Sequence, residues 1–188
     1  MKNFIREDLS FSLCGLNCAL CTMKLDGYCP GCGGGAGNQG CSIARCSIEH
    51  GNYQYCFECR EYPCDKYRDI TEYDSFITHR RQLSDMEKAQ SVGLESYLAE
   101  LEEKAKLLKY LLINYNDGRR KTFFCIATNL LEITDIDFTI RQIEREISTE
   151  TPLKDKALIA VKYFNTLAEQ KGVMLKLNKL PPKSKHTK

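Results

Sequence analysis

The chain has 188 residues and nearly balanced charge, with 27 Lys or Arg against 25 Asp or Glu and a formal net charge of +2. No stretch reaches the roughly 18 uninterrupted apolar residues of a membrane span, because Lys109 interrupts the richest segment, residues 107–115. The first twelve residues carry four charged side chains and lack the apolar core, about 7 to 15 residues long, of an export signal. We therefore expect a cytoplasmic protein with reduced thiols, not a membrane protein or a secreted disulfide framework.

Cysteines dominate the beginning of the chain, where ten of the 11 occur within one short stretch. Few large aliphatic side chains accompany them, so this stretch cannot bury enough apolar surface to fold alone. Metal–thiolate bonds would supply the missing stabilisation. The candidate metal ligands are Cys14, Cys18, Cys21, Cys29, Cys32, Cys41, Cys46, Cys56, Cys59 and Cys64.

The clearest local motif is the sequence CPGC at residues 29–32, where glycine permits the turn that brings two thiolates onto one ion. With Cys18 and Cys21 it offers four soft ligands, which suit a closed tetrahedral zinc site. The alternative is an iron–sulfur cluster, because Cys14, Cys18 and Cys21 also form the C-x3-C-x2-C triplet of radical-generating enzymes. The later, helical part of the chain leaves no room for the barrel of such an enzyme. Zinc, about two ions per chain, is therefore the favoured cofactor.

The five later cysteines can supply a second site in two ways, through the first four or through the last four of the group. Ten thiols make two tetrahedral sites with two cysteines over, or else one shared cluster with bridging sulfurs. We interpret the spare cysteines as structural ligands or buried thiols rather than as a reactive pair. The five are Cys41, Cys46, Cys56, Cys59 and Cys64, and the spare pair would be Cys14 with Cys41 or Cys64.

Two further residues could bear on the site. His50 lies within the cysteine-rich stretch, and we interpret it as a loop residue because enough thiolates are present without it. Cys125 is surrounded by apolar residues and has no partner nearby in the sequence, so we expect it to be a small core residue.

Four cysteine motifs occur in a fixed order: CGLNCALC at residues 14–21, CPGC at 29–32, CSIARC at 41–46 and CFECREYPC at 56–64. In this order they resemble the cysteine-rich bacterial and archaeal family known as domain of unknown function 3795, over residues 14 to about 67. The resemblance implies zinc binding by these cysteines and no particular activity. The loop before Cys29 is short and Gly33 stands where a basic residue is common, but neither departure removes a ligand.

Beyond residue 65 the apolar residues follow helical spacing. A seam from Leu94 to Tyr115 steps by three and four residues, with the charge pairs Glu100–Lys104 and Glu102–Lys106 expected on the solvent side. The remaining pattern predicts a helix at 67–81, a short apolar segment at 122–131, a helix along Ile136 to Ile147 capped by Thr134 or Asp135, and a last helix from Pro152 to Gly172. We expect a mainly α protein with a four- or five-helix antiparallel bundle, whose seam could serve that bundle or a dimer.

The predicted organisation is a cysteine-rich metal-binding module at 1–66, a helical bundle at 67–172 and a basic, disordered tail at 173–188. Zinc held by thiolates would give the first module a net charge of about −5, which disfavours binding to DNA. No catalytic constellation is recognisable. We therefore expect a zinc-stabilised binding or adaptor protein with an unknown protein partner, and the alternative is an iron–sulfur or thiol redox protein or enzyme.

Overall fold

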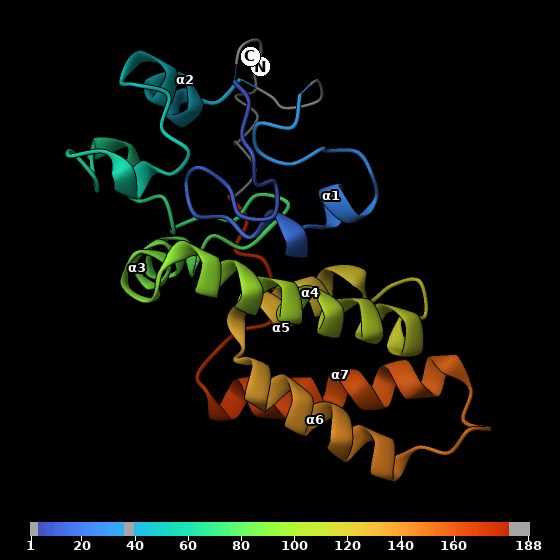
Figure 1. Cartoon of the computed structure of the whole chain (residues 1–188). Helices are drawn as coiled ribbons and strands as arrows, with labels where there is room; N and C mark the ends of the chain where they lie inside the picture. Colours follow the sequence, from blue (N-terminus) through green and yellow to red (C-terminus); the bar gives the residue numbers. More distant parts are fainter. Residues whose placement is uncertain (1–3, 36–39, 181–188) are drawn as a thin grey trace, which may run out of the picture.

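The computed structural model describes residues 4–35 and 40–180, and within them the protein is helical, without a β-strand (Figure 1). Three short 3-10 helices, η1 to η3, lie in the cysteine-rich part. The described helices are α1 (Thr22–Leu25), α2 (Ser42–Glu49), α3 (Gln82–Val92), α4 (Leu94–Tyr115), α5 (Lys121–Leu130), α6 (Ile133–Glu146) and α7 (Leu153–Gln170), with η1 at Cys18–Leu20, η2 at Cys56–Glu58 and η3 at Asp65–Tyr67.

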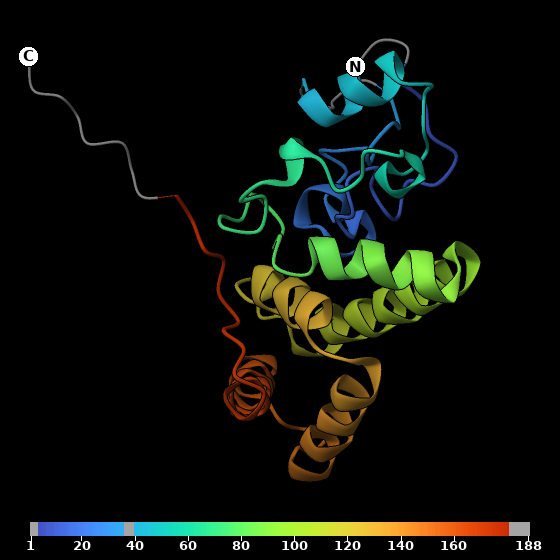
Figure 2. The ribbon, with the colours of Figure 1, turned by 90° about the vertical axis from the view of Figure 1, so that its left-hand side faces the viewer.

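The elements form three levels. The cysteine-rich loops and short helices lie on one side, α3, α4 and α5 form the middle, and α6 with α7 lies on the other side (Figures 1 and 2). The central element is α4, which packs against α3, α5, α6, α7 and the 3-10 helix η1. Because η1 begins at Cys18, this packing brings the cysteine-rich part directly onto the longest helix.

The bounds of α4 agree with the predicted seam, but its buried face is shifted. The most buried residues of α4 are Tyr97, Leu101, Lys104, Leu108, Leu111 and Tyr115, and the predicted Leu94, Leu98, Ala105 and Leu112 are only half-buried. The expected solvent-side pair of Glu100 and Lys104 is wrong, since Lys104 is buried and Glu100 accepts a hydrogen bond from Lys88 at 2.6 Å. The pair of Glu102 and Lys106 is present at 3.3 Å.

The helix predicted at 67–81 is wrong beyond the single turn of η3. The Asp74 carboxylate accepts hydrogen bonds from the backbone N–H of His79 at 2.7 Å and of Asn178 at 2.8 Å, and these contacts hold the chain in turns. A regular helix begins only at Gln82. Asp69 also adopts a left-handed conformation with φ 57°, which interrupts helical geometry.

The later helices occur where apolar spacing predicted them, with small differences at their starts. The segment at 122–131 forms α5, and α6 begins at Ile133 after Glu132, so neither Thr134 nor Asp135 is its cap. Pro152 immediately precedes the first residue of α7 instead of occupying it. Five helices, α3 to α7, therefore make up the predicted helical part within the described residues.

The prediction of a disordered tail is wrong for residues 173–180, and residues 181–188 lie outside the described residues. Leu175 is buried against the core, and the Arg80 guanidinium donates to the backbone carbonyls of Met174 at 2.6 Å and Lys176 at 2.9 Å. Asn178 also exchanges hydrogen bonds with Asp74. Polar contacts therefore hold this segment against residues 72–80. Its lysine-rich composition did not indicate these contacts.

One hydrophobic core crosses the boundary predicted near residue 66. Phe11, Leu20 and Tyr55 from the cysteine-rich part belong to the same buried cluster as Met86 of α3 and Tyr97 of α4. A second, small cluster of Phe4, Leu13 and Ala44 lies within the cysteine-rich part. The cysteine-rich part thus completes its burial on the helices, as expected of a segment with few large apolar residues.

Buried polar groups join the same two parts, and we call Asn17, Asp85 and Tyr97 the polar junction. The Asn17 amide donates to the Asp85 carboxylate at 2.8 Å and accepts from the Tyr97 hydroxyl at 2.8 Å. Nearby, Gly15 has φ +96°, and a Cβ there would lie 2.4 Å from Met86 Cγ, so only glycine fits this approach to α3. The loop that carries Cys14 and Cys18 is therefore held against α3 and α4.

Candidate metal centre

Four cysteines from the loops at the start of the chain and before α2 neighbour one another, and we call Cys14, Cys18, Cys32 and Cys41 the first set. Burial raises the pKa of Cys14 to about 11, and the nearby thiols of Cys32 and Cys41 raise it because thiolates repel one another. Burial raises the pKa of Cys18 to about 12, and its neighbouring thiols are Cys32, Cys14 and Cys21. Cys14 and Cys41 are two of the residues considered spare. The structure thus places them beside Cys18 and Cys32, one cysteine from each of the first two C-x2-C pairs.

Hydrogen-bond donors surround the sulfurs of the first set. The backbone amides of Leu16 and Cys32 lower the pKa values of Cys14 and Cys18, although the Leu16 N–H donates its hydrogen bond to the Ser12 hydroxyl at 2.7 Å. The backbone amide of Leu13 lowers the pKa of Cys32, and the Ser12 hydroxyl lies 3.3 Å from the Cys14 sulfur. Hydrogen bonds of this kind favour the thiolate over the neutral thiol, and thiolates are the form that binds metal.

Arg6 places a buried positive charge beside the first set. Its guanidinium, 4 % exposed, donates to the backbone carbonyls of Gln54 at 2.7 Å and Phe11 at 2.8 Å and lies 4.6 Å from the Tyr55 ring centroid. Its Nη2 is buried and has no hydrogen-bond partner among the described residues. Burial raises the pKa of Cys32, and the charge of Arg6 lowers it. A buried guanidinium requires a negative partner, which a thiolate at Cys32 would provide.

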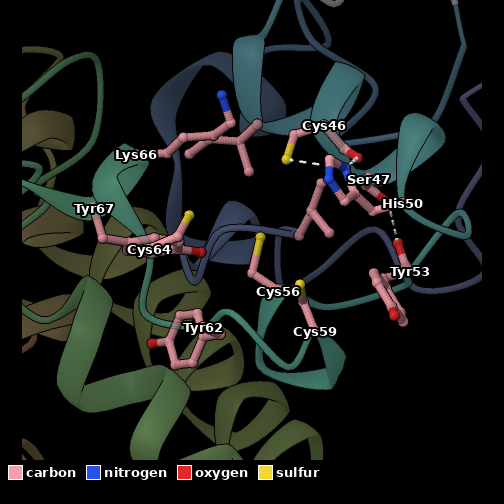
Figure 3. A pocket seen from close by; sticks show the side chains of 12 residues that line it. Cys46, Ser47, His50, Tyr53, Cys56, Cys59, Tyr62, Cys64, Lys66 and Tyr67 are labelled. Atoms are coloured by element: carbon pink, nitrogen blue, oxygen red, sulfur yellow. Dashed lines mark hydrogen bonds between the residues drawn. The ribbon is translucent and has the colours of Figure 1, made fainter.

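The second set, Cys46, Cys56, Cys59 and Cys64, lines one small cavity together with His50 (Figure 3). Cys46 comes from α2, Cys56 from η2, and Cys59 and Cys64 from the segments that follow it. The sulfur atoms point toward a common space, and the cavity is about 30 Å³ in volume, the size of one water molecule or one ion. Of the two predicted ways to form a second site, the geometry favours the last four cysteines.

Side chains supply the polar contacts of the second set. Burial raises the pKa of Cys56 to about 12, and the hydroxyl of Tyr67 lowers it. That hydroxyl is buried and has no partner with full hydrogen-bond geometry among the described residues. His50 Nδ1 lies 3.6 Å from the Cys46 sulfur and 2.8 Å from the Cys46 carbonyl oxygen. The His50 ring therefore contacts the last turn of α2. The loop role predicted for His50 stays a prediction.

The remaining cysteines lie outside these two sets. Cys21 neighbours both Cys18 and Cys125, and burial raises the pKa of Cys125 to about 12. Cys125 is 5 % exposed within the main core, which confirms its predicted place in the core, although the fold gives it a thiol neighbour that the sequence did not indicate. Cys29 donates its backbone N–H to the carbonyl of Met23 in the short helix α1.

Each set has the ligand composition of a zinc site, but its side chains do not converge on one point. Within residues 4–35 and 40–180, no three His, Cys, Asp or Glu side chains lie close enough together to hold an ion. The cysteine side chains would have to move to bring four sulfurs to about 2.3 Å from a zinc ion. The donor chemistry nevertheless fits zinc, since each set offers four thiols and a buried donor, Arg6 or Tyr67, that lacks an acceptor.

Sequence reasoning identified the cysteines and missed the two donors beside them. Arg6 precedes the first cysteine by eight residues, and no spacing rule connects it to Cys32. Tyr67 follows Cys64 by three residues, and its only sequence signal is that proximity. Both residues are recognisable from burial, which a sequence pattern does not give.

Comparisons with known proteins found no matching family model, no similar curated protein and no similar solved structure. The resemblance of the cysteine motifs to domain of unknown function 3795 therefore stays a prediction. Among the described residues, none of the helices has the length and apolar character needed to cross a membrane.

Proposed function

We propose that the cysteine-rich part binds two zinc ions, one through Cys14, Cys18, Cys32 and Cys41 and the other through Cys46, Cys56, Cys59 and Cys64. The observation that carries this proposal is the pairing of each set of four thiols with a buried donor that has no acceptor. Zinc-bound thiolates would accept from Arg6 Nη2 and from the Tyr67 hydroxyl, which removes the cost of burying these groups unpaired. The zinc ions would stabilise the fold, because closed four-thiolate sites leave no open coordination position for a reaction.

The role that this architecture supports best is that of a binding or adaptor protein acting in the reducing cytoplasm. A surface groove of about 810 Å³ lies between the segment of η2 and η3 and the exposed side of α3. Phe57, Tyr62 and Pro63 contribute apolar surface to it, and Glu87 and Gln90 contribute polar groups. Aromatic and polar groups combined in one concave surface are typical of sites that recognise a protein partner. We assign this groove as the surface for that partner.

Elemental analysis with a visible absorption spectrum tests the metal, on protein purified without oxygen. About two zinc ions per chain and no colour are expected. The variants Cys32→Ser and Cys59→Ser should each lose one zinc ion, and the matched control Cys125→Ser should lose none. Iron with sulfide and a brown chromophore would replace this proposal by the iron–sulfur alternative. Equal losses from all three variants would contradict the assignment of ligands.

A further inference from the structure

The two proposed zinc sites differ in how they are enclosed. The loop that carries Cys14 and Cys18 is held against α3, where the carbonyl of Cys14 accepts a hydrogen bond from the Gln82 side chain at 2.9 Å. Gly15 packs directly on Met86, and Asn17 belongs to the polar junction. Cys14 and Cys18 therefore lie on a loop that its packing on α3 and α4 holds in place, whereas Cys41 is half-exposed beside the exposed Ser42.

The second set is open to solution from one side. Cys59 and Cys64 line both the small cavity and the groove of about 810 Å³, and Tyr62 and Tyr67 form the wall that the two spaces share. A small molecule in the groove therefore lies against two of the four sulfurs. Figure 3 shows Tyr62 beside the cavity that the sulfur atoms of Cys56 and Cys59 face.

The second set also has a less rigid support. Cys46 is carried by α2, whose only buried residues are Ala44 and Ser47, and α2 lies at the edge of the molecule farthest from α6 and α7 (Figures 1 and 2). Local opening is easiest where few apolar contacts hold an element. Cys41 of the first set lies at the start of the same helix, so the difference in support comes from Cys14 and Cys18, whose loop bonds to α3 through Asn17 and the Cys14 carbonyl, and from the buried Arg6.

From this asymmetry, and resting on the proposed function, we infer that the second site is an exchangeable zinc site. It releases its ion to a small chelating ligand that enters through the groove, and the first site retains its ion. In the exchange, a donor atom of the chelator bonds to zinc as the bond from zinc to Cys59 or Cys64 breaks, and the freed thiolate takes a proton from water. Zinc stays divalent throughout, so no oxidant or reductant takes part.

The experiment is zinc release from the full chain, loaded with zinc, into an excess of the chelating dye 4-(2-pyridylazo)resorcinol without oxygen. Two phases of one zinc ion each are expected, with rate constants that differ by about tenfold or more, since charge-assisted hydrogen bonds commonly exceed 1.4 kcal/mol. Cys59→Ser should abolish the fast phase, Cys32→Ser should abolish the slow phase, and Cys125→Ser should change neither. A single phase, or a fast phase lost in Cys32→Ser, would overturn the inference.

Wild-type protein alone provides a second measurement in case a variant fails to fold. N-Ethylmaleimide added during release forms a carbon–sulfur bond with each freed thiolate, and peptide mass spectrometry locates it. Cys59 and Cys64 should be labelled with the fast phase, before Cys18 and Cys32. Labelling of Cys18 or Cys32 first would overturn the inference even if two zinc ions are bound. Fewer than two zinc ions at the start would contradict the proposed function itself, so the two failures are distinguishable.

Discussion

Replacing Asn17 tests whether the polar junction joins the cysteine-rich part to the helices. Asn17 is 4 % exposed, and its side chain forms hydrogen bonds with both Asp85 and Tyr97. Asn17→Ala removes a hydrogen bond to a buried carboxylate, worth about 1.5 to 3 kcal/mol, and leaves the buried Tyr97 hydroxyl without its acceptor, at about 1 kcal/mol or more. We expect the free energy of unfolding to fall by about 3 kcal/mol.

The assay is urea unfolding of zinc-loaded protein followed by circular dichroism. Asn114→Ala is the matched control, because Asn114 also donates through its side-chain amide, but to a backbone carbonyl on the exposed side of α4. Its cost should stay within about 0.5 kcal/mol. Tyr97→Phe should cost about 1 kcal/mol, and combining it with Asn17→Ala should cost less than the sum, because the two residues share one hydrogen bond. If Asn17→Ala costs no more than Asn114→Ala, the junction does not hold the two parts together.

The pH dependence of stability provides a second test of the polar junction. Burial raises the pKa of Asp85, and the nearby charges of Arg81 and Lys104 lower it. Asn17→Asp would add a second buried carboxylate, which raises the folded-state pKa of the pair above the unfolded value near 3.9. A carboxyl with a raised folded pKa destabilises the fold increasingly as pH rises through that pKa. The variant's loss of stability should therefore be larger at pH 7 than at pH 5, and a pH-independent loss would contradict the reasoning.

The remaining predictions concern the metal sites. Arg6→Gln should weaken zinc binding at the first site about 10- to 100-fold and leave the second unchanged, whereas Arg6→Lys, which keeps the charge, should weaken it less, as competition with a chelator of known affinity will measure. Equal effects of the two variants would show that charge is irrelevant. Tyr67→Phe should weaken only the second site, by about tenfold, with Tyr163→Phe as the control, since the Tyr163 hydroxyl binds Glu146 on the surface. Complete zinc removal should end amide protection in residues 14–64 and in α3 while α6 and α7 keep theirs, and hydrogen exchange will show whether α3 follows the cysteine-rich part.

How much of the fold was predictable differs between the two parts. The bounds of α4 follow from apolar residues three and four apart, because one helix face must be buried over its whole length. Lys104 is an exception, because apolar spacing does not predict its burial. Its spacing from Glu100 suits a solvent-side pair, but Lys104 is buried near Arg81, Asp85 of α3 and Glu132, and only long-range packing brings these residues to it. The turns at 67–81 escaped prediction for the same reason, since Asp74 is held by Asn178, 104 residues away in the sequence.

The candidate ligands were recognisable from spacing, and their division into sets was not. A C-x2-C pair indicates that two thiols can reach one ion, but it does not tell which other pair completes the site. The structure gives Cys18 the neighbours Cys32, Cys14 and Cys21, and Cys21 also lies toward Cys125, a residue that no spacing connects with it. The paths of these loops depend on close packing at glycines, with Gly15 on Met86 of α3, Gly31 on Leu9 and Gly33 on Arg6.

The position of the first set has a consequence for how folding and metal binding depend on each other. Its loop supplies Asn17 to the polar junction, Phe11 and Leu20 to the main core, and Cys14 and Cys18 to the proposed site. Zinc bound there would stabilise the same backbone that covers α3 and α4, so free energy of metal binding would appear as stability of the helices. The second set contributes no residue to the junction, and its contact with the main core is through Cys56, beside the buried Tyr55. Loss of its ion would cost the fold less, which is the condition that an exchangeable site must meet.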